Sequence, residues 1–135
     1  MSQENVDAAR RFIDAYNRRD MESMVQDLDA DIEWHSGILA ALGGEAAVFR
    51  GHEGVRDALR DLYEALGETQ IECSELRDLG DRVVTIGRFR IRGKESGAEV
   101  ESPWGAVADF KNGKAICIRS YFNLEEVLQA AGLSE

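Results

Sequence analysis

The segment from Phe110 to Phe122 is the strongest structural signal in this sequence. The pair Asn112-Gly113 at its centre is typical of a two-residue type I′ hairpin turn, because both residues tolerate a positive φ. Alternating residues flank the turn, and the second run leads directly into Asn123 to Glu126, which has the pattern of a capped helix. The segment therefore predicts a β-hairpin followed by a short C-terminal helix.

Helical patterns precede this hairpin and strand patterns lead up to it. Apolar residues at helical spacing predict helices at residues 3–18, 21–28 and 51–66, with Asp20 as an N-cap and Gly67 closing the third helix. Alternating residues predict strands at 31–36, 69–79, 83–92, 100–110 and 115–122, and a last helix covers 124–131. Helices first and a meander second indicate an α+β fold, not an alternating parallel sheet.

The segment from 37 to 49 fits neither pattern. It is apolar, yet Gly43-Gly44 interrupts it, and glycine is costly to order in a helix. Residues 38–49 can cover an apolar pocket and still move, as a lid does, or they can pack permanently over one end of the fold. Both alternatives stay open at this point.

Composition excludes several classes of function. The 135 residues suit one domain spanning 1–135, and a net charge of −10 disfavours nucleic acid and anionic membranes as partners. Cys73 and Cys117 stand alone, and His35 and His52 lack ligand spacing, so we expect neither a metal site nor a cofactor. The polar start of the chain shows no signal peptide, and we expect a cytoplasmic protein.

Several strings along the chain point to a family. They are 15–20 (Ala-Tyr-Asn-Arg-Arg-Asp), 31–35 (Asp-Ile-Glu-Trp-His), 50–56 (Arg-Gly-His-Glu-Gly-Val-Arg), 78–83 (Asp-Leu-Gly-Asp-Arg-Val) and 112–121 (from Asn-Gly-Lys to Tyr). With the order of elements, they make the chain similar to the SnoaL-like branch of the nuclear-transport-factor-2-like superfamily. The resemblance implies a cone-shaped fold, in which a curved antiparallel or mixed sheet wraps the N-terminal helices as in a cystatin-like α+β barrel. It also implies an apolar cavity and a dimer, but no single activity.

The residues that two enzymes of this superfamily use are absent at the matching positions. By resemblance to ketosteroid isomerase, the catalytic base matches Trp34, the oxyanion-hole tyrosine matches Phe12 and its acidic partner matches Ala106. The epoxide-hydrolase pattern needs a carboxylate where this chain has Ser120. Neither mechanism is therefore expected.

Strand alternation suggests which side chains line the cavity implied by the resemblance. Residues 100, 102, 104, 106, 108 and 110 share one face, as do 116, 118, 120 and 122, and these mostly apolar faces should point inward. Serines on these faces can orient a hydroxyl or carbonyl group of a ligand. The predicted ligand-binding residues are Phe12, Tyr16, Trp34, Tyr63, Ser102, Trp104, Ile118, Ser120 and Phe122.

Three residues are candidates for catalysis. His35 ends the first strand and titrates near neutrality, but alternation points it outward unless the strand end kinks. Glu72 and Glu75 lie on a strand with ragged alternation, where a bulge can turn one carboxylate inward. The competing interpretation of all three is a rim or surface position.

The opposite face of the sheet carries apolar residues among charged ones. These are Val84, Ile86, Val107, Cys117 and Tyr121. Because a monomer rarely exposes so many clustered apolar groups, we expect this convex face to form a homodimer.

Three functions remain open. The first is binding of a small, largely apolar molecule in the cavity, and the second is a cyclase, isomerase or hydrolase that uses His35, Glu72 or Glu75. The third is a dimeric scaffold whose cavity is filled by its own side chains. A void with a buried titratable group favours the enzyme, a void without one favours the binding protein, and no void favours the scaffold.

Overall fold

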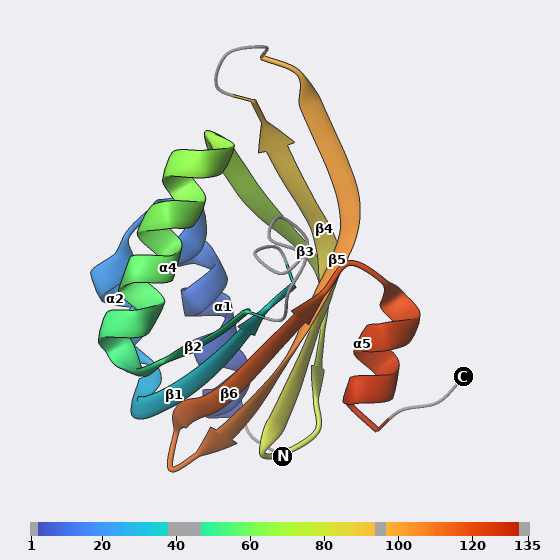
Figure 1. Ribbon diagram of the computed structural model, residues 1–135. Coiled ribbons are helices and arrows are strands. Elements are labelled where there is room, and N and C mark those ends of the chain that lie inside the picture. The colour runs from blue at the N-terminus through green and yellow to red at the C-terminus, as the bar shows by residue number, and fades with distance from the viewer. Residues whose placement is uncertain (1–2, 38–46, 94–96, 133–135) are drawn as a thin grey trace.

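The computed structural model describes residues 3–37, 47–93 and 97–132 of the chain (Figure 1). The helices in these ranges are α1 (Gln3–Asn17), α2 (Met21–Gln26), α4 (Gly51–Leu66) and α5 (Leu124–Ala130). The strands are β1 (Leu28–Ser36), β2 (Ala47–Arg50), β3 (Glu68–Asp78), β4 (Arg82–Arg92), β5 (Glu99–Lys111) and β6 (Lys114–Tyr121). Among the described residues, no helix combines the length and apolar character needed to cross a membrane.

The strands form one open, mixed sheet in the order β2-β1-β6-β5-β4-β3. Strands β1 and β6 run parallel, and every other neighbouring pair is antiparallel. Helices α1, α2 and α4 lie on the concave side of the sheet, and α5 lies on the opposite side (Figure 1). The fold is the α+β cone that the sequence predicts.

Local signals in the sequence mark the ends of the elements correctly. Asn112 and Gly113 have φ values of 54° and 80°, as a type I′ turn requires between β5 and β6. The Asp20 side chain accepts a hydrogen bond from the Ser23 amide at the start of α2. Asn123 caps α5 through the Glu126 amide in the same way.

The main core lies between the helices and the concave side of the sheet. Ile32 on β1, Leu59 on α4 and Phe89 on β4 are almost completely buried there. Inside this core the Tyr63 hydroxyl donates a hydrogen bond to the Tyr16 carbonyl, which joins α4 to α1 at 2.9 Å. The buried polar groups of the aromatic residues are thus used to fix the helices relative to one another.

A bulge in β6 changes the expected alternation at one end of the strand. Asp109 pairs with Cys117, whereas Phe110 pairs with Ala115, so Ile116 is an extra residue on β6. Ala115 is therefore buried in the main core, and Ile116 does not occupy the inward position that simple alternation assigns to it. From Cys117 onward the alternation holds.

The outer face of the sheet differs from the sequence-based expectation. Val84 and Val107 are 0% and 1% exposed, because Val127 of α5 packs against them within the same chain. Ile86 and Tyr121 are partly buried at the edge of this cluster. Helix α5 thus largely covers the apolar residues that were expected to form a dimer surface. Their exposure therefore no longer supports a dimer.

Part of the segment from 37 to 49 belongs to the sheet. Strand β2 pairs antiparallel with β1, and the Phe49 ring lies 5.9 Å from the Trp34 ring between centroids. Residues 47–49 are therefore not part of a lid. The rest of the expected lid, residues 38–46, lies outside the described residues.

Candidate functional site

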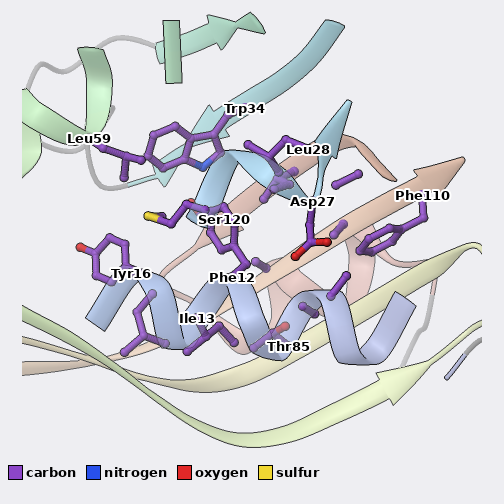
Figure 2. A pocket seen from close by; sticks show the side chains of 18 of the residues that line it. Phe12, Ile13, Tyr16, Asp27, Leu28, Trp34, Leu59, Thr85, Phe110 and Ser120 are labelled. Carbon is purple, nitrogen blue, oxygen red and sulfur yellow. The ribbon is translucent and has the colours of Figure 1, made fainter. Parts of the chain in front are cut away.

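A cavity of about 60 Å³ lies between α1 and the concave side of the sheet (Figure 2). Its walls come from α1, α2, α4 and the strands β1, β3, β4, β5 and β6. The lining is Ala8, Ala9, Phe12, Ile13, Tyr16, Met24, Asp27, Leu28, Trp34, Leu59, Ile71, Thr85, Trp104, Ala106, Ala108, Phe110, Ala115, Ile118 and Ser120. Most of these side chains are apolar.

Small side chains that face one another leave this space open. Ala8 and Ala9 lie on α1, and Ala106 and Ala108 occupy inward positions of β5 opposite them. Ala115 adds a fifth methyl group from β6. A methyl side chain cannot span the gap between a helix and a sheet, whereas a leucine or phenylalanine at any of these positions fills it.

Aspartate 27 is the carboxylate among the lining residues. It ends α2, and its side chain is 18% exposed. The Arg11 guanidinium donates to both oxygens of Asp27, at 2.9 and 3.0 Å, and this raises the pKa of Arg11 above its ordinary value. Figure 2 shows Asp27 with Leu28 and Phe110 at one end of the cavity, away from Tyr16 and Leu59.

Tyrosine 16 lines the cavity with its ring, and its hydroxyl points away from the cavity (Figure 2). Burial raises the pKa of Tyr16 to about 12, and the hydrogen bond from Thr69 lowers it by a smaller amount. The phenol is therefore uncharged at neutral pH and provides no base.

Tryptophan 104, one of the lining residues, carries an unsatisfied polar atom. Its indole Nε1 is buried, and it has no hydrogen-bond partner in the part of the chain that the structure describes. Buried donors are nearly always paired in folded proteins, so this atom requires an explanation. Ser120 differs, because its hydroxyl oxygen accepts a hydrogen bond from the Gly37 amide at 3.0 Å.

The family model of the SnoaL-like domain matches residues 9–118 of the chain. This chain is a member of the SnoaL-like domain family. The match includes most of α1 and all strands except the last residues of β6. No curated protein sequence matches this SnoaL-like chain.

Solved structures confirm the fold of this SnoaL-like protein. An NTF2-like protein of unknown function from Burkholderia pseudomallei K96243 is 24% identical, with a TM-score of 0.81 and coverage of 96% of this chain and 97% of that one. TerC, co-crystallised with polyporic acid, is 22% identical, with a TM-score of 0.79 and coverage of 97% and 98%. A hypothetical protein of ketosteroid-isomerase-like fold from Catenulispora acidiphila DSM 44928, in complex with trimethylamine, is 14% identical, with a TM-score of 0.75 and coverage of 94% and 93%.

The structure brings together most of the ligand-binding residues expected for this SnoaL-like chain. Those that line the cavity are Phe12, Tyr16, Trp34, Trp104, Ile118 and Ser120. Tyr63 instead packs behind Tyr16, and its hydroxyl donates a hydrogen bond to the Tyr16 backbone carbonyl. Ser102 lies beyond the cavity on β5 and bonds to the Pro103 carbonyl, while Phe122 packs against Phe89.

The catalytic candidates lie outside the cavity of this SnoaL-like fold. Strand β1 keeps its alternation to the end, so Trp34 points inward and His35 points outward, where its Nε2 lies 2.7 Å from the Glu33 carboxylate. A bulge between Cys73 and Glu75 is present as expected. Glu75 is nevertheless exposed.

Glu72 and Glu75 are both engaged with arginines on the surface. Glu72 accepts from Arg90 of the neighbouring strand at 3.1 Å, and Glu75 pairs with Arg77 two residues along β3. Neither carboxylate lines the cavity. Asp27 lines the cavity but was not among the candidates from the sequence. Its position at the end of a short helix carries no pattern that distinguishes it from a solvated residue.

Proposed function

We propose that this SnoaL-like protein binds a small, largely apolar molecule that carries a hydrogen-bond acceptor. The observation that carries the proposal is the alanine-walled cavity, and one of its lining residues, Trp104, has a buried indole N–H with no partner among the described residues. An indole N–H can only donate. We expect a small movement of the ring to let this N–H donate to a ligand oxygen of a ketone, ester or phenol.

The size and polarity of the cavity suit an apolar group better than water. About 60 Å³ exceeds the 10–15 Å³ that one water needs. A water placed there finds few of the two to four polar partners that hold buried waters. Transferring an apolar group of a few carbon atoms into this space removes its surface from water at a gain of about 25 cal/mol per Å².

Two neighbours of the same fold support binding of small molecules. TerC was crystallised with polyporic acid, and the protein from Catenulispora acidiphila holds trimethylamine. Their low identity to this chain limits the comparison to the fold. The proposed ligand class therefore depends on the cavity of this chain and not on theirs.

Acetone and isobutene provide a matched pair of probes small enough for this cavity. Each has four heavy atoms in nearly the same shape, but only acetone carries an acceptor oxygen. Titrations followed by NMR should show that the protein binds both, with acetone about 3–10 times tighter, the factor that one hydrogen bond of 0.5–1.5 kcal/mol provides. If neither probe binds, the proposal is contradicted.

Filling the cavity provides the control for location. Ala106→Leu places three further carbons in the cavity and should abolish binding of both probes. Ala98→Leu makes the same change at an exposed position and should leave both affinities unchanged. Equal binding by Ala106→Leu and the wild type contradicts the cavity as the site.

Turnover is the second candidate, because Asp27 places a carboxylate in the cavity wall. A carboxylate can abstract a proton next to a ketone. Incubation of acetone in D₂O tests this, since an enzyme should incorporate deuterium into the methyl groups of acetone faster than buffer does, and Asp27→Asn should not. The filled scaffold, the third alternative, predicts no void and does not account for the cavity.

We also propose that the protein is a homodimer, as the resemblance implies. Helix α5 covers Val84 and Val107, so a convex-face dimer has to use the rim formed by Ile86, Tyr121 and α5 itself. Light scattering at micromolar concentration should give twice the mass of the 15.0 kDa chain. Tyr121→Glu should shift the mass toward the monomer, and a monomeric wild type contradicts this proposal.

A further inference from the structure

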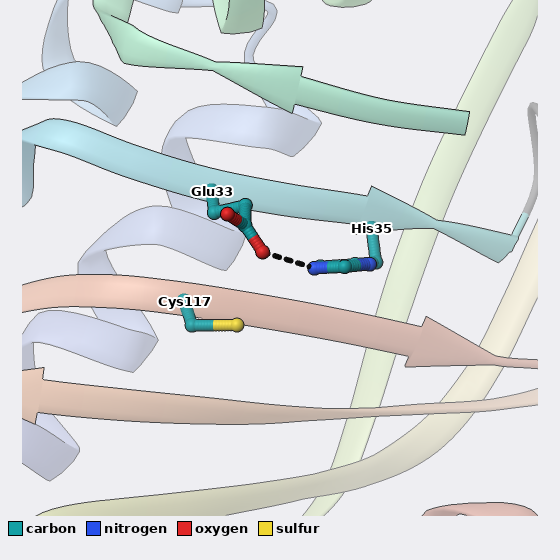
Figure 3. A group of neighbouring side chains, drawn as sticks. All are labelled: Glu33, His35 and Cys117. Carbon is teal, nitrogen blue, oxygen red and sulfur yellow. Dashed lines mark hydrogen bonds and ion pairs between the residues drawn. The ribbon is translucent and has the colours of Figure 1, made fainter. Parts of the chain in front are cut away.

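A histidine, a cysteine and a carboxylate meet on the outer face of the sheet (Figure 3). Strands β1 and β6 are parallel neighbours, and their register places Glu33 beside Cys117. His35 follows Glu33 by two residues and so points to the same face. The nearest ligand atoms of the three side chains all lie within 4.8 Å of one another.

We propose that Glu33, His35 and Cys117 form a binding site for a divalent zinc-type metal ion. The site is separate from the cavity, because Trp34 and Ile118 point to the other side of the same strands. The proposal is therefore independent of the proposed ligand. It reverses the sequence-based expectation that Cys117 has no chelating neighbours.

The ligand types favour zinc over the hard cations. Zinc takes thiolate sulfur, imidazole nitrogen and carboxylate oxygen in tetrahedral sites, whereas magnesium and calcium take oxygen alone. Three protein ligands leave a fourth position for water, as in zinc sites that are not purely structural. His35 and Glu33 have half-exposed side chains, each 37% exposed, so an ion can reach them from solvent.

The backbone already holds the three residues in place. All of them lie on hydrogen-bonded strands, so binding requires only side-chain rotation and no movement of a loop. At present His35 Nε2 and Glu33 Oε1 are joined by a hydrogen bond of 2.7 Å. The second oxygen, Glu33 Oε2, lies 3.4 Å from Arg50 Nε, which leaves Oε1 for the metal.

Charged groups from the neighbouring strands set the affinity. Arg119 on β6 lies beside Cys117 and 3.9 Å from Asp109 of β5. Arg82 on β4 is close enough to Cys117 to interact with it electrostatically, and it forms an ion pair with Asp109 at 2.7 Å. The positive charges of these two arginines and of Arg50 weaken cation binding, and the negative charges of Asp109 and Glu33 strengthen it. We therefore expect weaker binding than in a four-ligand structural site.

Metal binding has a defined proton balance. The Cys117 thiol gives its proton to solvent and binds as the thiolate, and the metal takes His35 as the neutral imidazole with its proton on Nδ1.

Cobalt(II) is a spectroscopic probe for this site. Titration of the reduced, untagged protein with Co²⁺ should produce the near-ultraviolet charge-transfer band of a cobalt–thiolate bond, and Zn²⁺ should remove it. Cys117→Ser should abolish the band. His35→Gln and Glu33→Gln should keep it but weaken Co²⁺ binding at least tenfold.

The chain supplies its own matched controls, because it contains only two cysteines and two histidines. Cys73→Ser and His52→Gln should leave the band and the affinity unchanged, and thermal unfolding confirms that each variant is folded. The proposal is overturned if the wild type gives no band, if Cys73→Ser removes it, or if the His35 and Glu33 variants bind as tightly as the wild type.

Discussion

Gly105 on β5 lies directly beneath Val127 of α5. A Cβ atom at Gly105 would be 2.7 Å from Val127 Cγ2, a distance that non-bonded carbon atoms do not adopt. Helix α5 therefore packs closely on the outer face of the sheet at a position where only glycine leaves room. This contact is why the apolar residues of that face are covered within one chain.

Gly105→Ala should destabilise the protein by about 1–3 kcal/mol, because the new methyl group overpacks this contact. The same methyl group would lie 2.8 Å from the Thr85 carbonyl oxygen of the neighbouring strand. Urea unfolding measures the change. Combining Gly105→Ala with Val127→Ala separates the two contacts, since the alanine should cost less when the valine is absent. An equal cost in both backgrounds assigns the effect to the Thr85 carbonyl instead.

Asn17→Ala should cost about 1–3 kcal/mol, because it leaves buried backbone groups unpaired. The Asn17 side chain donates to the Ile71 carbonyl at 2.9 Å and accepts from the Ile71 amide at 2.8 Å, so it continues the sheet at the edge of β3. Asn17→Asp keeps the acceptor but places a carboxylate oxygen against the Ile71 carbonyl oxygen, so it should cost at least as much as Asn17→Ala. Unchanged denaturation midpoints for both variants would show that water replaces these bonds freely.

Tyr16 should make stability fall at high pH. The pKa of its phenol is about 12 in the fold and about 10 in an unfolded chain, so the unfolded state loses its proton first. The contribution is complete below pH 10 and is lost as the pH rises toward 12, by roughly 3 kcal/mol. Burial also raises the pKa of Tyr63, so Tyr16→Phe should lose less stability over this range than the wild type without becoming independent of pH. Parallel pH profiles for the two proteins would contradict the assignment.

Trp104→Phe should separate binding from stability. The substitution removes an N–H that has no partner among the described residues, so the melting temperature should fall only by what the lost ring contacts contribute. It should also equalise the affinities for acetone and isobutene. If the preference for acetone persists, the acceptor is bound by another group of the wall.

The elements whose signals are local could be predicted from the sequence. The Asn112-Gly113 turn and the caps at Asp20 and Asn123 each depend on a few neighbouring residues, and all three are present as expected. The inward faces of β1 and β5 follow from alternation alone, which is why Trp34 and Trp104 were placed in the cavity wall correctly.

The features that were missed depend on contacts between distant segments. The bulge at Ile116 and the packing of α5 over Val107 arise from pairing and docking that no local pattern encodes. Cys117 gains His35 as a neighbour only through the parallel register of β1 and β6. Asp27 reaches the cavity because α2 ends there, and its sequence context resembles that of any solvated aspartate.

The alanine methyl groups provide the most direct test of the cavity as a ligand site. Cavity methyls come from Ala8, Ala9, Ala106, Ala108 and Ala115, whereas Ala130 and Ala131 lie at the end of α5 on the other side of the sheet. In methyl-labelled protein titrated with acetone, the NMR signals of the five cavity alanines should shift and saturate together, while those of Ala130 and Ala131 stay fixed. Shifts confined to the α5 alanines, or none at all at saturating acetone, would contradict binding in the cavity.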